Sequence, residues 1–171
     1  SGKKIDKLNK KIVLVTGGAG FIGSNLVDEM VKKKWKVRII DNLSIGKKEN
    51  LNPVAKFYKL DIRDLSKIKP VFKGVDYVFH LAAFPRVQPS IDDPFGTNEI
   101  NLNGTINVLI AARQAKVKKV IFSSSSSVYG DQEKSPNRED MKSNPMSPYA
   151  LQKYASELYC RLFNLLYGLP T

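Results

Sequence analysis

The chain has 171 residues, of which 42% are hydrophobic and 26% charged, a composition typical of one globular domain with a buried core. No apolar run approaches the ~20 residues of a membrane span and no apolar signal segment is visible, so we expect a cytoplasmic protein with no membrane partner. The single cysteine excludes an internal disulfide and a metal site built from cysteines, so we expect no metal. The net charge of +12 would suit nucleic-acid binding, but the lysines are dispersed without interleaved aromatic residues, so we expect a solvated basic surface and no nucleic-acid partner.

A hydrophobic run over residues 11–16 leads into three regularly spaced glycines, Gly17, Gly20 and Gly23. This pattern predicts a buried strand, a tight turn and a helix over about residues 21–34. The first N–H groups of a helix are unpaired and its dipole is positive there, so the turn is suited to a pyrophosphate. By itself, the triplet is equally compatible with an ordinary glycine turn.

A second strand is predicted over residues 35–41, and it ends on an acid, Asp41. Asp41 lies eighteen residues after Gly23, near the spacing at which a carboxylate accepts hydrogen bonds from a ribose diol. An acid at this position repels a 2′-phosphate, which favours NAD over NADP. The alternative is an aspartate that serves only a turn.

A short third strand is predicted over residues 56–60, and it ends beside the second strand in a doubly wound sheet. Asp61 follows it and can accept a hydrogen bond from an adenine amino group. Asp64 is placed to cap a helix over about residues 65–72. The two interpretations are compatible.

The fourth predicted strand, residues 75–80, ends on the only histidine, His80. A lone histidine at a strand end is more often structural than catalytic, so we expect any catalysis here to proceed without a histidine base. Residues 81–83 are mostly small and allow a ligand to approach the backbone. Three prolines predict a loop over residues 84–94, which contains Arg86 and is placed to border a substrate.

A long helix is predicted over about residues 95–114, although Asn101, Asn103 and Gly104 in its interior are poor helix formers. We expect polar contacts or close packing to explain them. A fifth strand over residues 119–123 leads into a run of serines, whose hydroxyls at the end of a central strand indicate hydrogen bonding to a polar ligand. A surface loop is expected to follow, over residues 131–148.

The last predicted helix begins at Ser147, with Pro148 in its first turn. Tyr149 and Lys153 are four residues apart and therefore share one face of this helix. A second, apolar face needs to be covered by a partner subunit or another helix, which is the reason to expect a homodimer. This apolar face consists of Leu151, Ala155, Leu158, Leu162 and Leu165.

Three motifs coincide in order: the glycine turn with Asp41, the serines 123–125 before Val128-Tyr129-Gly130, and the Tyr149-xxx-Lys153 pair. Together they resemble the extended short-chain dehydrogenase/reductase family, in particular its nucleotide-sugar epimerase and dehydratase branch. The resemblance implies an α/β fold of the Rossmann type, with a doubly wound parallel sheet and helices on both faces. It divides the chain into an N-terminal extension, residues 1–10, and an NAD-binding domain, residues 11–171, with the C-terminal substrate domain expected to be missing.

The resemblance also implies roles for individual residues. Ser125, Tyr149 and Lys153 would be catalytic, and the nucleotide-sugar substrate would contact Arg86, Ser125, Ser126 and Tyr149. The residues implied to bind NAD are Gly17, Gly20, Phe21, Ile22, Gly23, Asp41, Asn42, Ser44, Asp61, Ile62, Leu81, Ala82, Ala83, Asn101, Tyr149 and Lys153.

The implied chemistry is consistent with these side chains. A neutral phenol is a poor base near neutral pH, but the Lys153 cation and the positive nicotinamide ring favour the phenolate of Tyr149. Ser125 would orient the reacting oxygen of the sugar. Hydride then passes to bound NAD and gives a transient keto-sugar.

The reaction that follows depends on acids that this sequence lacks. Dehydratases of this branch carry an Asp-Glu pair where this chain has Ser126 and Ser127, and the decarboxylases place a glutamate just before Val-Tyr-Gly. Their absence favours a UDP-sugar 4-epimerase acting on UDP-glucose or UDP-N-acetylglucosamine. The alternatives are a 4,6-dehydratase or decarboxylase of the same family, or a non-catalytic NAD-binding module.

Overall fold

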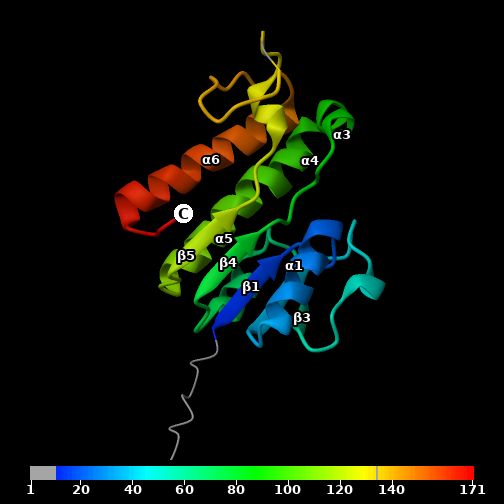
Figure 1. Cartoon of the computed structure of the whole chain (residues 1–171), viewed down its shortest axis with the longest axis vertical. Helices are drawn as coiled ribbons and strands as arrows, with labels where there is room; N and C mark the ends of the chain where they lie inside the picture. The colour runs from blue at the N-terminus through cyan, green and yellow to red at the C-terminus, as the bar shows by residue number, and fades with distance from the viewer. Residues whose placement is uncertain (1–10, 134) are drawn as a thin grey trace, which may run out of the picture.

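Five parallel strands form a single sheet in the order β3-β2-β1-β4-β5 (Figure 1). The computed structural model describes residues 11–133 and 135–171, so the predicted N-terminal extension lies outside the described residues. The strands are β1 (Ile12–Thr16), β2 (Lys36–Asp41), β3 (Lys56–Lys59), β4 (Tyr77–His80) and β5 (Lys119–Phe122). This order, with the crossover from β3 to β4, confirms the predicted doubly wound Rossmann-type fold.

Alternate side chains of the strands enter two separate hydrophobic cores. Val13, Val15 and Ile39 pack against α1 (Phe21–Lys32) on one face. Leu14 and Ile40 belong to the core of the other face, which is covered by α2 (Leu65–Ile68), α5 (Gly104–Gln114) and α6 (Pro148–Tyr167). The strands are buried on both faces because the crossover helices lie on both sides of the sheet.

The carboxyl ends of β1, β2 and β4 lie at one edge of the sheet. Thr16 is opposite Ile40 on one side and His80 on the other. The glycine turn that follows Thr16 is therefore next to Asp41 and to the segment after His80, which is where ligands bind in open parallel sheets.

The predicted loop over residues 84–94 is wrong in part, because it contains α3 (Val87–Asp92). Three prolines suggested a loop, but Pro89 lies in the first turn of this short helix, where a missing N–H costs no intrahelical bond. Pro94 opens the next helix, α4 (Pro94–Asn98), and Asp93 caps it by accepting from Gly96 N at 2.8 Å.

The predicted long helix is present, but a π-helical turn interrupts it. Glu99–Asn103 forms this π turn between α4 and α5, at the place where the sequence contains poor helix formers. Short 3-10 helices complete the fold at Lys48–Asn50, Lys69–Phe72 and Ser126–Tyr129. Among the described helices, none is long and apolar enough to cross a membrane.

Candidate functional site

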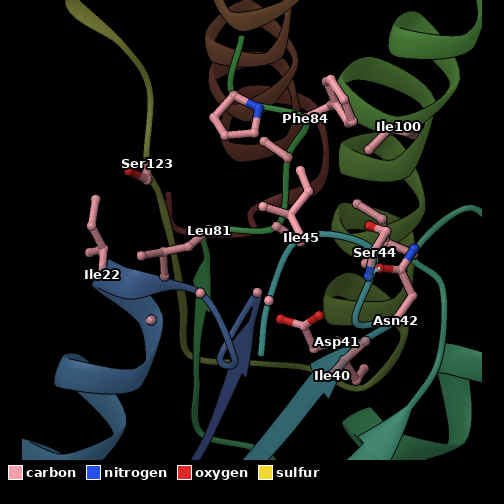
Figure 2. A pocket seen from close by; sticks show the side chains of 18 of the residues that line it. Ile22, Ile40, Asp41, Asn42, Ser44, Ile45, Leu81, Phe84, Ile100 and Ser123 are labelled. Carbon is pink, nitrogen blue, oxygen red and sulfur yellow. Dashed lines mark hydrogen bonds between the residues drawn. The ribbon is translucent and has the colours of Figure 1, made fainter. Parts of the chain in front are cut away.

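A cavity of about 410 Å³ opens at the carboxyl edge of the sheet. Figure 2 shows Ile22, Leu81 and Ser123 at one end of it, and Asn42 and Ser44 at the other. Its lining residues are Gly17, Gly20, Phe21, Ile22, Gly23, Ile40, Asp41, Asn42, Ser44, Ile45, Gly46, Leu60, Asp61, Ile62, Leu81, Ala82, Ala83, Phe84, Pro85, Ile100, Ser123, Ser124, Tyr149 and Lys153.

The structure brings most of the sequence-predicted site residues to this one cavity. Every residue predicted to bind the cofactor lines it except Asn101, which lies behind the wall. Ser125, Ser126 and Arg86 also fall outside the lining. The placement groups the predicted residues, and their individual roles remain predictions.

The glycine turn packs too closely for side chains. A Cβ on Gly23 would lie 2.1 Å from the carbonyl oxygen of Gly17, and Gly17 itself has a φ of +74°. Gly20 is the N-cap of α1, and no side chain caps this helix. Because α1 starts at the cavity, its first N–H groups are available to a negatively charged group.

Asp41 is buried at the end of β2, and its carboxylate is bonded on both oxygens. Oδ2 accepts from Ala19 N at 3.0 Å, and Oδ1 accepts from Leu43 N at 2.8 Å. The carboxylate therefore ties the glycine turn to the loop after β2. Each oxygen retains a second lone pair, so Asp41 can still accept from a hydroxyl in the cavity.

Asp61 and Asn42 form a polar cluster at the end of the cavity that lies away from Ile22 and Ser123 (Figure 2). Asp61 accepts from Arg63 Nη2 at 2.8 Å and from Asn42 Nδ2 at 2.9 Å. The hydrogen bonds from Arg63 are the main reason that the pKa of Asp61 is lowered to about 2. Asp64 caps α2 by accepting from Lys67 N at 3.2 Å, which agrees with the expected cap.

Tyr149 and Lys153 are both buried on the face of α6 that lines the cavity. Lys153 Nζ donates to the carbonyl of Ser123 at 2.9 Å and lies 4.8 Å from the centre of the Phe122 ring. Burial lowers the pKa of Lys153 to about 8, so the amine stays mainly protonated at neutral pH.

The serine segment is attached to α6 at two neighbouring points. Besides the bond from Lys153 to Ser123, the Ser124 hydroxyl donates to the carboxylate of Glu157. Ser125 instead caps the following 3-10 helix by accepting from Ser127 N at 3.2 Å. Glu157 was missed from the sequence, although its spacing of four residues after Lys153 places it on the same helical face.

The start of α6 is fixed by two serines. Ser147 Oγ accepts from Ala150 N at 3.1 Å, which agrees with the predicted cap. Ser90 of α3 accepts from Tyr149 N at 3.0 Å, a contact that the sequence did not indicate because α3 itself was missed. The N–H groups in the first turn of α6 are therefore used within the protein.

Two buried polar residues support the cavity from behind. The Asn101 side chain accepts from Phe84 N at 2.7 Å and donates to Gln152 Oε1 at 2.8 Å. His80 is bonded to Thr16 and Thr105, which agrees with a structural histidine. Burial, aided by the Lys153 cation, lowers the pKa of His80 to about 3, so the ring is neutral and unsuited to general-acid chemistry.

The sequence of this chain matches a known protein family. The family model described as the NAD dependent epimerase/dehydratase family matches residues 13–171. A putative UDP-glucose 4-epimerase of Methanocaldococcus jannaschii is 44% identical over 160 residues, which span 92% of this chain and 52% of that protein.

Solved structures agree. A Thermus thermophilus UDP-glucose 4-epimerase in complex with NAD has a TM-score of 0.88 at 39% identity, over 92% of this chain and 52% of that one. A Methanobrevibacter ruminantium UDP-N-acetylglucosamine 4-epimerase in complex with UDP-N-acetylmuramic acid has a TM-score of 0.88 at 45% identity, over 94% and 52%.

This chain thus spans about half the length of the relatives that it matches. The match nevertheless includes the glycine turn, the serine segment and the Tyr149-xxx-Lys153 pair. It confirms the resemblance inferred from the motifs, and the family's dependence on NAD agrees with the predicted cofactor. The chain belongs to the NAD dependent epimerase/dehydratase family.

Proposed function

We propose that this chain is the cofactor-binding and catalytic part of an NAD-dependent UDP-sugar 4-epimerase. The observation that carries the proposal is that one cavity is lined by the glycine turn, Asp41, Tyr149 and Lys153. The 4-epimerase names of the Methanocaldococcus, Thermus and Methanobrevibacter relatives support the same reaction and the UDP-glucose or UDP-N-acetylglucosamine substrate class.

The groups that line the cavity suit the parts of NAD. The uncapped start of α1 offers N–H groups and a positive dipole end to the pyrophosphate. Asp41 offers carboxylate oxygens to a ribose diol, and its charge opposes a 2′-phosphate. Leu60 and Ile62 provide an apolar surface for the adenine ring, with Asp61 at its edge.

Side chains of α6 would carry the proton chemistry. When bound, NAD would accept a hydride from the sugar and return it. Tyr149 would take the proton from the sugar hydroxyl, and the buried Lys153, four residues further along the same face of α6, would place its cation in the same cavity. Ser124 lines the cavity, and Ser125 follows it, so this segment would orient the reacting oxygen.

The serine segment favours epimerisation over elimination of water. Ser126 and Ser127 open a 3-10 helix where dehydratases of this branch carry two acids. With no acid at these positions, the hydride would return to the carbon that it left, and the proton would return to the oxygen on that carbon. The alternatives are a 4,6-dehydratase or decarboxylase of the same family and a non-catalytic NAD-binding module. The following experiments separate the epimerase from the dehydratase and from the non-catalytic module.

The reaction is tested by adding UDP-glucose, or UDP-N-acetylglucosamine, to the chain alone and to the chain combined with the C-terminal half of the Methanocaldococcus relative. NMR of the sugar follows the products. We expect the 4-epimer, with more turnover in the combined protein. A 4-keto-6-deoxy product would show a dehydratase, and NAD binding without any product in either preparation would support the non-catalytic alternative.

Cofactor binding is tested separately with Asp41→Ala. A hydrogen bond to a charged group contributes about 1.5–3 kcal/mol, so we expect NAD affinity, measured by calorimetry, to fall roughly 10- to 100-fold. Asp140→Ala removes the same charge from an exposed ion pair with Arg138 and serves as the control. Equal losses in the two variants would attribute the effect to net charge and reject the ribose contact.

We also infer that α6 packs against a second copy of the chain. Its outer face carries exposed leucines at 151, 158, 162 and 165, an apolar stripe of the kind that subunit interfaces bury. Sedimentation analysis of Leu162→Glu should then show a weaker dimer than wild type. Val54→Glu, at another exposed apolar position, should leave the dimer intact, and a monomeric wild type would reject the inference.

A further inference from the structure

A chain of buried hydrogen bonds crosses the molecule behind the cavity. Thr16 ends β1, His80 ends β4 and Thr105 lies in the first turn of α5, and all three are at most 1% exposed. Thr16 Oγ1 lies 2.6 Å from His80 Nδ1, and His80 Nε2 lies 2.9 Å from Thr105 Oγ1. The single histidine of the sequence thus uses both ring nitrogens to join two strands to a helix.

The last acceptor in this series of hydrogen bonds determines where each proton lies. The backbone carbonyl of Asn101 can only accept, so the Thr105 hydroxyl donates to it, at 2.7 Å. The hydroxyl then has no second proton to give to His80. His80 Nε2 must therefore donate to Thr105, and Nδ1 must accept from Thr16. The Thr16 oxygen is then free to accept the amide proton of Ala82, at 3.3 Å, in the cavity wall.

Asn101 connects the same chain to α6. Its backbone carbonyl also accepts from Ser156 Oγ at 3.1 Å, and its side-chain Nδ2 donates to Gln152 Oε1 at 2.8 Å. The Asn101 side chain also bonds the backbone of Phe84 twice. Oδ1 accepts from Phe84 N at 2.7 Å, and Nδ2 donates to Phe84 O at 3.2 Å. The cavity wall is therefore held at Ala82 by the buried chain and at Phe84 by Asn101, and both attachments end on α6.

We propose that His80 is a positioning residue, held as the neutral Nε2–H tautomer, that ties the Ala82 side of the cavity wall to the helix carrying Tyr149 and Lys153. Among the described residues, Lys153 is the charged group that acts on the ring, and together with burial it keeps the imidazole neutral. Where the inference extends to NAD, it rests on the proposed function: a cofactor that contacts Ala82 would be sensed at the imidazole.

The tautomer is measurable without assignment, because the sequence has one histidine. Histidine labelled with ¹⁵N should give a single imidazole with Nε2 protonated and Nδ1 bare, unchanged between about pH 5 and about pH 8. An imidazolium, or a proton on Nδ1, at about pH 6 would overturn the proposal. This measurement needs neither NAD nor substrate.

The mechanical link is tested by Thr105→Val, which removes the hydroxyl, against Thr105→Ser, which keeps it. In the ligand-free chain we expect amide exchange at Ala82 to become roughly tenfold faster in Thr105→Val and to stay near wild type in Thr105→Ser. Exchange at Val37 in β2 serves as the reference for any loss of global stability. Equal rates at Ala82 in both variants, after this correction, would overturn the link.

A titration with NAD completes the test. The ¹⁵N signals of His80 should shift saturably in wild type and in Thr105→Ser, and the shift should be at least halved in Thr105→Val. NAD binding seen by calorimetry without any shift at His80 would overturn the coupling and leave the proposed function intact. Failure of NAD to bind, with the tautomer and exchange results as expected, would reject the proposed function and support the positioning role.

Discussion

Two helices begin at the cavity, and the N–H groups of their first turns differ in their hydrogen-bond partners. α1 follows Gly20 and has no side-chain cap. α6 follows Ser147, which accepts from Ala150 N, and Ser90 accepts from Tyr149 N. The first N–H groups of any helix need partners outside the helix. Those of α6 find them within the protein, whereas those of α1 face the cavity.

This difference assigns different work to the two helices. α1 presents backbone, so its turn needs glycines and close packing more than particular side chains. α6 presents the side chains of Tyr149 and Lys153, so it needs a fixed position, and buried bonds from α3 and the π turn provide it. Each of the following variants affects one helix and should spare the other.

The largest expected effect is at Tyr149. Tyr149→Phe removes the proposed base, and a positioned base contributes about 10²- to 10⁴-fold in rate, so we expect kcat of the combined protein to fall by that factor. NAD affinity should change far less, because the turn of α1 is untouched. Tyr159→Phe makes the same chemical change at an exposed position of α6 and should leave kcat unaltered. A comparable loss in both variants would contradict the assignment.

The α1 side of the cavity was largely predictable from the sequence. Gly17, Gly20 and Gly23 act through local geometry, since a strand, a tight turn and a helix start are encoded by adjacent residues, and Asp41 was predicted from its spacing after this motif. The caps Asp64 and Ser147 were predictable for the same reason, because each bonds a backbone N–H three residues further along.

The support of the α6 side was not predictable. Ser90, Asn101 and Gln152 are bonded across separations of 51 to 59 residues, and no local pattern indicates such partners. Asn101, which was predicted to contact the cofactor, does not line the cavity, and its side chain is bonded to Phe84 in the cavity wall. The poor helix formers around it did signal polar contacts, although not the π turn that accommodates them.

A pH dependence should follow from the imidazole that supports the α6 side. In the unfolded chain His80 binds a proton as the pH falls below 6.5, whereas burial keeps it neutral in the fold to about 3. The unfolded state thus binds more protons in this window, so stability falls as the pH falls. From pH 7.5 to pH 5 we expect His80 to cost about 2 kcal/mol.

This contribution is measured as the difference in urea unfolding between wild type and His80→Gln at both pH values. Glutamine cannot titrate, so its stability should fall less between the two pH values, whatever its absolute stability. Carboxylates such as Asp61 titrate alike in both proteins and cancel in the difference. Parallel pH curves for the two proteins would show that His80 binds protons in the fold as it does in the unfolded chain, and would reject the neutral ring.

A smaller effect is expected from the cap of α6. Ser147→Ala removes the acceptor for Ala150 N, and the loss of an N-cap costs about 1 kcal/mol of unfolding free energy. NAD affinity should remain at the wild-type value, because α1 begins elsewhere in the cavity. A weaker affinity in this variant would mean that the two helix starts are not independent.

The smallest change reverses the difference between the helices. Gly20→Ser places a hydroxyl at the N-cap of α1, where the backbone is extended, with φ −78° and ψ 172°. Replacing glycine by serine as a cap stabilises a helix by only a few tenths of a kcal/mol, and a Cβ here would lie 3.3 Å from Gly17 O, so stability should barely move. The new hydroxyl would, however, occupy the N–H groups proposed for the pyrophosphate, so NAD affinity should fall. Unchanged affinity, measured by calorimetry, would show that the open start of α1 is not used by the cofactor, since a competing cap is then without consequence.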